Sequence, residues 1–288
     1  MVSAALPLSL RAPFFVLLTF VATWITLGPI SIALIAVGLG FIGLCHIPIG
    51  FWKRVAIIAL AGAALAFISL KGIPGVRPSL LHKAIPILAS MFMFRLIVYL
   101  YELRYEKKPV SAWMRIAYFF LLPNVAFTLF PVVDFAAFKR TYFDRPDFEI
   151  YQRGARLILR GVTHLLAYRF VYYYWTPVTD HIVGIRGVLF FTTSAWILFL
   201  HVSGIFHIAI GILCLFGFNL PDANRLYFLA ASPNEIWRRA NIYWKDFMLK
   251  VFYLPAYKAL QKRKLSMQSS LIIATVFVFA TTWMLHSY

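Results

Sequence analysis

Long apolar stretches separated by short charged segments dominate this chain. No Asp, Glu, Lys or Arg occurs between Arg11 and Lys53, between Arg186 and Asp222, or after Lys264. Each gap is long enough for one or two helices of roughly 20 residues, the length that crosses a bilayer. The alternation typical of strands is absent, so we expect helices rather than a barrel to satisfy the backbone hydrogen bonds.

The pattern predicts an all-α, polytopic transmembrane protein of about eight to ten spans. We expect Gly28-Pro29 to interrupt the first long run, and Ser203-Gly204 to break or kink a later one, because Gly and Pro interrupt helices. Arg11 precedes a first span that we interpret as retained rather than as a cleaved signal peptide. The expected spans are 12–27, 29–49, 54–70, 84–101, 112–133, 155–176, 185–202, 204–219 and 267–286.

The chain has no linker-like tract and no internal repeat. We therefore expect a single membrane domain over 1–288, with N-terminal helices over 1–110 and a core over 111–288 that contains a helix over 233–256. The two cysteines, Cys45 and Cys214, lie in apolar sequence and are interpreted as buried small hydrophobic residues.

Composition agrees with a membrane protein. Hydrophobic residues make up 62% of the chain and charged residues only 13%, against about 25% charged in soluble domains. The net charge of +18 is concentrated in loops, which the positive-inside rule assigns to the cytoplasmic side. Topology and contact with anionic membrane lipids explain most of this charge. Docking of an acidic carrier of thioesters stays open, whereas no soluble domain is present to bind nucleic acid.

Several ionisable residues lie inside expected spans, where such groups are costly and face a protein interior, and six of them are candidates for chemistry. For five of them we expect a packing or interfacial role. Those five are Arg95, His164, Arg169, His201 and His207. We expect no metal or haem site, since the last two histidines are six residues apart, a poor fit to one helical face.

The sixth residue, His286, shares its helical face with Thr282 and Trp283. A neutral imidazole, with an ordinary pKa of about 6.5, suits general-base catalysis in a site with little water. A covalent hydrolase mechanism has no support, because no G-x-S-x-G nucleophile motif occurs. His286 is therefore the candidate base.

The stretch from Ser232 to Pro255 carries the second candidate. As one continuous helix, it places Asn241 on an apolar stripe with Trp237 and Trp244, opposite a charged side. An amide on such a face needs a partner or costs roughly 1–3 kcal/mol. Asn241 is thus either paired structurally or directed at a substrate.

Three stretches in the C-terminal third resemble the membrane-bound O-acyltransferases (MBOAT family), most closely the bacterial branch of alginate O-acetylation and teichoic-acid D-alanylation proteins. They are SGIFHIAIG at 203–211, GFNLP at 217–221 and ASPNEIWRRANIYWKDFMLKVFYLPAY at 231–257. Two positions depart from that branch: Ala240 replaces a usual Trp, and Asn241 replaces a usual His. Asn at this position is similar to the sterol and diacylglycerol acyltransferase branch, and His286 in TTWMLHSY corresponds to the intramembrane His of the family.

The resemblance implies an MBOAT-like helical core and transfer of an acyl group, other than an amino-acyl group, from a thioester to a hydroxyl. His286 and Asn241 would be the catalytic residues. His286 would take the proton of the acceptor hydroxyl, and Asn241 would orient the donor, hold the histidine or stabilise the oxyanion. The neighbours expected to contact substrates are Trp237, Arg238, Arg239, Trp244 and Trp283.

No permanently bound cofactor is expected, since the donor would be acyl-CoA or an acyl carrier protein thioester. The acceptor would be a hydroxyl of a polysaccharide, a cell-envelope component or a small molecule. Expected partners are membrane lipids, an acyl carrier protein or other membrane subunits. The expected location is a bacterial inner (cytoplasmic) membrane.

The family normally continues through further spans after the His that corresponds to His286, whereas this sequence ends at Tyr288. Either the natural protein is longer, or it lacks the C-terminal part of the core. In the second case the chain would be a non-catalytic, MBOAT-like structural subunit of a larger membrane complex, which Ala240 also favours. A transporter or channel is a third interpretation, with neither inverted repeats nor a charged pore ring to favour it.

Overall fold

Helices form the regular secondary structure of the protein in the computed structural model, which describes residues 2–71, 78–106, 110–129, 131–176 and 182–286. The prediction of an all-α protein is confirmed. The α-helices are α1 (Val2–Ala5), α2 (Leu8–Leu27), α3 (Ile30–Cys45), α4 (Phe51–Lys71), α5 (Pro78–Leu103), α6 (Ala112–Phe119), α7 (Pro123–Ala126), α8 (Phe135–Arg140), α9 (Asp147–Tyr174), α10 (Gly184–Ile197), α11 (Leu200–Cys214), α12 (Pro233–Arg239), α13 (Ile242–Met248), α14 (Leu254–Lys262) and α15 (Met267–His286). A 3₁₀ turn, η2 (Tyr227–Leu229), and a π-helical turn, η3 (Leu249–Tyr253), complete the set.

Several helices are long and apolar enough to cross a membrane, as in a multi-pass membrane protein. Within the described residues there are five such segments, and α3 is a shorter apolar helix. This number is smaller than the eight to ten spans expected. The five segments are Leu8–Leu27, Phe51–Ile68, Leu81–Leu103, Gly184–Cys214 and Met267–Leu285.

One expected span, 112–133, is replaced by the short helices α6 and α7 and by loops. The cause lies in α5, where Arg95 is only 2% exposed. Its guanidinium donates to the carbonyl oxygens of Tyr118 (2.8 Å) and Phe119 (3.2 Å), at the end of α6, and to Asn124 Oδ1 (2.5 Å). The buried cation is satisfied by carbonyls that a continuing helix would use itself. The expectation of a packing role for Arg95 is met.

The expected helix breaks are met in part. Gly28 ends α2 with φ of +63°, a conformation that glycine adopts without strain, and α3 follows. The break expected at Ser203-Gly204 is absent, since α11 runs through both residues and the turn falls at 198–199 instead. The expected span 155–176 corresponds to α9, whose repeated arginines keep it outside the apolar segments above.

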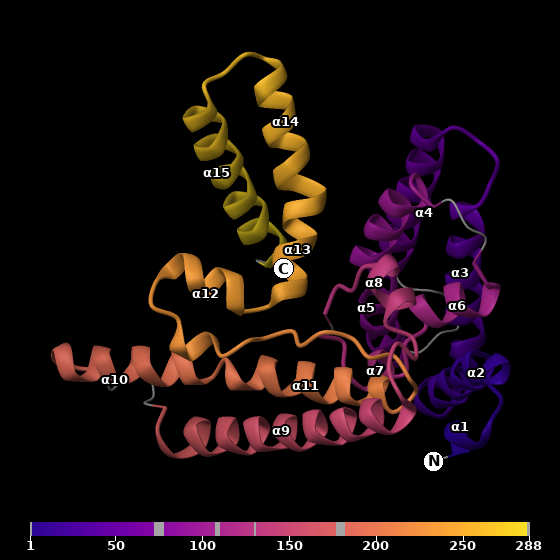
Figure 1. Ribbon diagram of the computed structural model, residues 1–288, viewed down its shortest axis with the longest axis horizontal. Coiled ribbons are helices and arrows are strands. Elements are labelled where there is room, and N and C mark those ends of the chain that lie inside the picture. The colour runs from indigo at the N-terminus through magenta and orange to yellow at the C-terminus, as the bar shows by residue number, and fades with distance from the viewer. Residues whose placement is uncertain (1, 72–77, 107–109, 130, 177–181, 287–288) are drawn as a thin grey trace.

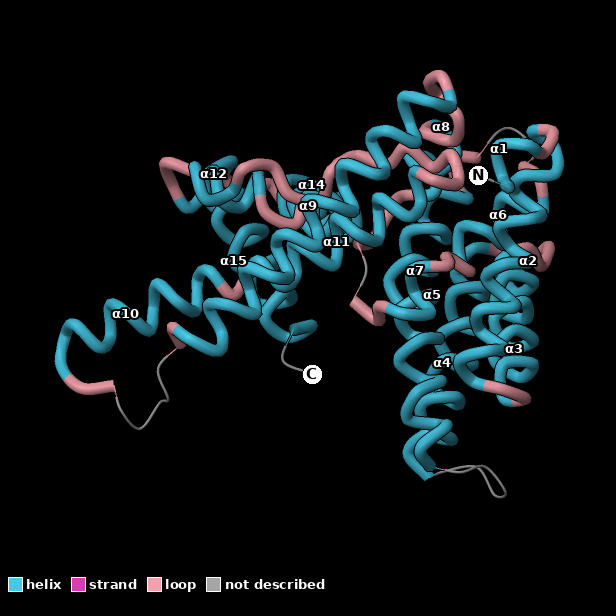
Figure 2. The backbone as a smooth tube through the Cα atoms, turned by 90° about the horizontal axis from the view of Figure 1, so that it is seen from below, coloured by secondary structure: helices cyan, strands magenta, loops and turns pink. Residues whose placement is uncertain are grey.

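The helices form three groups (Figure 1). α2 to α8 pack as one bundle at the right of the view, while α9 and α11 lie side by side along the bottom and extend to the left from the base of that bundle. α14 and α15 form a hairpin that lies above α9 and α11 in this view. Seen from below, α10 extends away from the bundle (Figure 2). The loop and short helices between α11 and α14 therefore connect all three groups.

Glycines set the close, antiparallel contact between α9 and α11. Gly154 and Gly161 on α9 face Gly211 and Gly204 on α11, and the two glycines of each helix are seven residues apart. A Cβ at Gly161 would lie 2.6 Å from the carbonyl oxygen of Gly204, and one at Gly211 would lie 2.8 Å from that of Gly154. The two backbones thus touch at two levels, as small residues allow between membrane helices.

Two apolar clusters hold the groups together. The larger joins α2, α3, α5, α6, α8, α9 and α11, with fully buried aromatic side chains such as Phe15, Tyr118 and Phe138. The smaller cluster joins α5 to α13 and α15 through Val98, Phe247 and Val278. The C-terminal hairpin is thereby fixed to the N-terminal bundle by a separate core.

Replacing Gly161 by Ala should destabilise the protein by about 1–3 kcal/mol or more, because the added methyl group meets backbone atoms that cannot rotate away. Thermal unfolding of the purified protein in mild detergent measures the effect. Gly40→Ala on α3 is the matched control, since its Cβ meets no atom within 4 Å and alanine is the better helix former. Equal melting temperatures for the two variants would contradict the assigned role of the glycine contact.

Candidate functional site

The stretches that suggested chemistry meet where α9, α11, the loop after α11 and α13 come together. The GFNLP segment, residues 217–221, is the part of the loop after α11 that enters this region. Gly217 has φ of +90°, and a Cβ there would lie 2.2 Å from the Phe143 ring, so both backbone and space require glycine. A single antiparallel bridge between Tyr142 and Phe218 holds the segment against the chain that follows α8.

Arg153, near the start of α9, anchors the same segment. Its guanidinium donates to Asn219 Oδ1 (2.7 Å), to the carbonyl oxygen of Leu220 (2.6 Å) and to Asp222 Oδ1 (2.5 Å). The charge of Arg160, 3.7 Å from the other oxygen of Asp222, adds to the attraction. A planar guanidinium with several fixed donors suits such a convergent set of acceptors. Arg153 therefore fixes the loop that leads to the site.

A chain of hydrogen bonds then connects the loop to both long helices. The backbone N–H of Asn241 donates to Asn224 Oδ1 (2.8 Å), which orients that amide because only the oxygen can accept. Asn224 Nδ2 donates to Ser203 Oγ (3.3 Å) on α11. Ser203 Oγ lies 3.2 Å from His164 Nδ1 on α9, within hydrogen-bond distance. Asn224 and Ser203 are both buried.

His207 lies one turn along α11 from Ser203 and packs edge-on against His164, with ring centroids 5.1 Å apart. Its Nδ1 is 2.6 Å from the carbonyl oxygen of Ser203. A carbonyl only accepts, so Nδ1 carries the proton, and in the neutral ring Nε2 is an acceptor. His207 is 4% exposed, and its Nε2 has no hydrogen-bond partner in the described part of the chain.

Tyr227, in η2, lies beside the polar group formed by Ser203, His164 and His207. It is 4% exposed, and burial raises the pKa of its hydroxyl to about 12, an effect that the nearby Ser203 hydroxyl opposes. No hydrogen bond of standard geometry joins the two groups, and the tyrosine oxygen has no partner among the residues described. Tyr227 and His207, which lie beside Ser203, thus each keep one buried polar atom, Oη and Nε2, that could still form a hydrogen bond.

The segment that bears Asn241 differs from the single helix expected over 233–256. It is divided into α12, α13, the π-helical turn η3 and α14. Asn241 has φ of +43° and caps α13, accepting with Oδ1 from the backbone N–H of Trp244 (3.3 Å). The apolar stripe expected from one helix therefore does not exist as such. Asn is a favoured residue for both the positive φ and the cap.

The cap leaves half of the Asn241 amide available. Its Oδ1 is engaged, whereas Nδ2 makes no hydrogen bond with the residues that the structure describes. Of the two possibilities for this side chain, structural pairing accounts for the oxygen. The nitrogen remains a donor that a ligand could use.

The two tryptophans expected near a substrate pack in the smaller apolar cluster. Trp244 is 8% exposed and meets Phe94 of α5 edge-on at 5.2 Å. Trp237 on α12 packs against Phe279 of α15, with ring centroids 5.2 Å apart. Helix α15, which includes His286, therefore packs against the segment that carries Asn241.

The remaining expected site residues lie outward or outside the described side chains. Arg239 pairs with Glu235 and donates to the carbonyl oxygen of Leu226, while Arg238 is exposed. Trp283 on α15 is 75% exposed. His286 belongs to α15, but its side chain lies outside the described part of the structure.

The π-helical turn η3 carries one residue of a half-buried ion cluster. Lys250 Nζ lies 2.5 Å from Glu102 Oε1 at the end of α5 and 2.8 Å from Asp134 Oδ2 before α8. Burial lowers the pKa of Lys250, but hydrogen bonds and attraction from both carboxylates outweigh it, so the net pKa is raised. Lys250 therefore stays charged and ties the C-terminal segment to the N-terminal bundle.

Sequence reasoning treated His164 and His207 as separate packing residues and passed over Asn224 and Tyr227. The glycine spacing on α9 and α11, which is visible in the sequence, is the signal that relates His164 to the residues of α11. Pairing those glycines antiparallel places His164 beside Ser203. The residues after the GFNLP segment carry no comparable signal, because their approach depends on a loop.

Comparison of the sequence with protein-family models and with curated proteins gives no match. Among the described residues, no group of three or more His, Cys, Asp or Glu side chains is arranged to hold a metal ion. The chemistry of this region is therefore argued from its own geometry.

Replacing Asn224 by Ala should destabilise the protein by about 1–3 kcal/mol, because the backbone N–H of Asn241 and the Ser203 hydroxyl lose a buried partner. The melting temperature in mild detergent reports the loss. Asn234→Ala, at an exposed position of α12, is the control and should change little. A loss no greater than that of the control would exclude Asn224 as the link between α11 and α13.

Proposed function

We propose that this protein is a membrane O-acyltransferase with an MBOAT-like core, which moves an acyl group from a thioester to a hydroxyl. The observation that carries the proposal is the convergence of the stretches that resemble that family. Asn224, three residues after GFNLP, is hydrogen-bonded to both Ser203 and Asn241, and Tyr243 Oη donates to the carbonyl oxygen of Pro221 (2.7 Å). Segments that converge in space are expected of a shared site.

The position of α15 gives a second reason. Val278 and Phe279 pack with Phe247 and Trp237, so the helix that includes His286 lies against the segment of Asn241. Both segments also contact α5 through the same apolar cluster. A reaction centre between them would be enclosed by apolar side chains, which strengthens electrostatic interactions with reacting groups.

In the proposed reaction, His286 takes the proton of the acceptor hydroxyl as its oxygen attacks the thioester carbonyl carbon. The carbonyl π electrons move onto oxygen, and the free Nδ2 of Asn241 donates to the resulting oxyanion, an effect worth roughly 3–4 kcal/mol for one well-placed donor. Collapse of the intermediate breaks the C–S bond. The thiolate leaves and takes back the proton from His286.

The donor in this proposal is acyl-CoA or the thioester of an acyl carrier protein. Exposed cations, including Arg238 and the two lysines of α14, would attract the phosphates or acidic surface of either donor. The acceptor is a hydroxyl of a polysaccharide, an envelope component or a small molecule. The membrane proposed is a bacterial inner membrane, in which both a cytoplasmic thioester and an envelope hydroxyl are within reach.

Acyl transfer by the purified full chain from radiolabelled thioesters to an envelope extract tests the proposal. His286→Ala should lower the rate about 100-fold to 10,000-fold through loss of the base. Asn241→Asp should keep the α13 cap but lose the amide donor, with a loss of about 100-fold to 1,000-fold. His201→Ala, an exposed histidine stacked on Tyr168, is the control and should remain active.

The Asn241→Asp variant separates two roles of one residue. If the side chain serves only as a cap, the variant keeps both its melting temperature and its activity, and the oxyanion role is wrong. Equal labelling by the His286→Ala variant and the unmodified protein would reject the catalytic role of His286. No labelling of the extract with any donor would instead favour a non-catalytic membrane subunit.

A further inference from the structure

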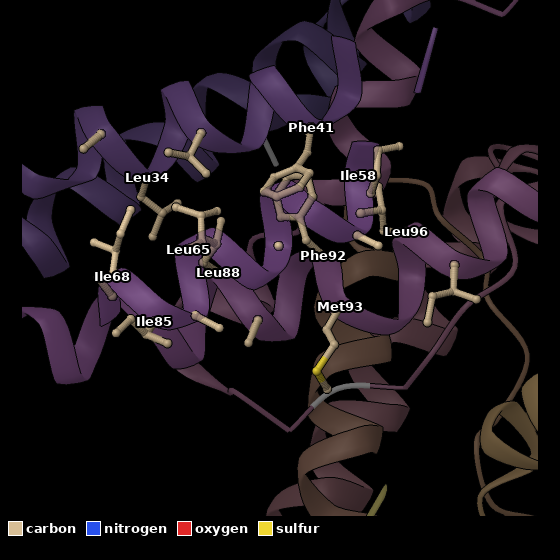
Figure 3. Close-up of a pocket in the computed structure, with 18 of the residues that line it drawn as sticks. Leu34, Phe41, Ile58, Leu65, Ile68, Ile85, Leu88, Phe92, Met93 and Leu96 are labelled. Carbon is tan, nitrogen blue, oxygen red and sulfur yellow. The ribbon is translucent and has the colours of Figure 1, made fainter. Parts of the chain in front are cut away.

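An apolar groove of about 600 Å³ lies between α3, α4 and α5 (Figure 3). All its lining residues are apolar, with Phe41, Leu65 and Phe92 from the three helices among them. Its volume falls in the range of pockets that hold small molecules, roughly 300–1,000 Å³. The groove belongs to the N-terminal bundle and is separate from the candidate site.

The groove follows most of the membrane-crossing length of α5. It is lined from Leu81 to Leu100, which corresponds to about 28 Å of helix at 1.5 Å per residue and nearly matches a hydrocarbon core of roughly 30 Å. Met93 and Ile97, which line it, are 52% and 41% exposed, so the groove is open to its surroundings. In a membrane those surroundings are lipid tails.

One end of the groove is basic. Three cations lie at the helix ends next to it, Lys53 and Arg54 in the first turn of α4 and Arg104 directly after α5, and we call this set the basic end. The guanidinium of Arg104 lies 4.6 Å from the Phe51 ring, which joins the two helix ends. Lys53 and Arg104 are exposed, and neither forms an ion pair with a described residue.

The carboxylates nearest along the chain are already engaged. Glu102 pairs with Lys250, and Glu106 pairs with Lys139. The cations of the basic end are therefore not neutralised by these groups. This end also carries the exposed Trp52, 77% accessible, an amphipathic aromatic residue typical of the level where lipid headgroups begin.

We propose that the groove binds an anionic phospholipid of the cytoplasmic leaflet, with an acyl chain along α5 and the headgroup phosphate at Lys53 and Arg104. The apolar lining accepts the chain, and the unpaired cations attract the net negative charge. A soluble anion would leave the groove unfilled, and a zwitterionic lipid would gain the chain contacts without the net charge. The site is independent of the proposed acyl transfer.

Binding of phosphatidylglycerol and of phosphatidylcholine with identical chains, measured by native mass spectrometry and by the melting temperature of the full chain, tests this site. The unmodified protein should prefer phosphatidylglycerol and be stabilised more by it. Lys53→Gln combined with Arg104→Gln should weaken phosphatidylglycerol about fivefold for each cation removed. Lys258→Gln with Lys262→Gln, exposed cations of α14, is the matched control and should keep the preference.

A second variant tests the groove itself. Gly62 lines it, and a Cβ there meets no atom within 4 Å, so Gly62→Phe places a ring in the groove and should weaken both lipids. Equal affinity for the two lipids in the unmodified protein would overturn the headgroup site. Unchanged binding by Gly62→Phe would overturn the groove as the binding place. Loss of a dimer in that variant, without loss of lipid, would assign the groove to a second copy of the chain.

Discussion

The backbone contact between α9 and α11 is the constraint on which the candidate site depends. At Gly161 and Gly204 the two helices approach so closely that neither has room for a methyl group. This approach brings His164 within 3.2 Å of Ser203. Larger residues at the glycine positions would separate the helices and with them the hydrogen-bonded chain that continues to Asn224. Small side chains therefore determine where the polar side chains meet.

Polar groups in this protein are grouped and linked rather than scattered through the apolar interior. Each group joins elements that are distant in sequence: Arg153 holds the GFNLP loop, and Lys250 holds the end of α5. A buried polar group without a partner is costly, so each such link favours a single arrangement of the helices it joins. Tyr227 and His207, the neighbours of Ser203, are among the residues that keep a buried polar atom without a partner in the described part of the chain.

Much of the architecture could be predicted from the sequence, and the reasons for the failures are physical. Apolar stretches identified α2, α4, α5 and α15, and Gly28 marked a true helix end. The span expected over 112–133 failed because Arg95, distant in sequence, takes up the carbonyls at the end of α6. Local pattern cannot reveal a partner contributed by another helix.

The candidate site was predictable to a similar extent. Asn241 was selected correctly as an amide that needs a partner, but its place on a continuous helix was wrong, since a positive φ breaks the helix there. His164 and His207 were visible as isolated residues. Their shared environment follows from tertiary packing, and Asn224 enters through a loop whose course no periodic pattern encodes.

Arg95 also bears on how the chain enters the membrane. A translocon would have to accept α5 with an arginine inside it, and such a residue costs about 2.5–3.5 kcal/mol at the centre of an inserting helix. The carbonyls that satisfy the guanidinium belong to α6, which is synthesised afterwards. Helix α5 therefore reaches its final environment only once the following segment has emerged and folded back against it, so these two parts of the chain mature as one unit during biogenesis.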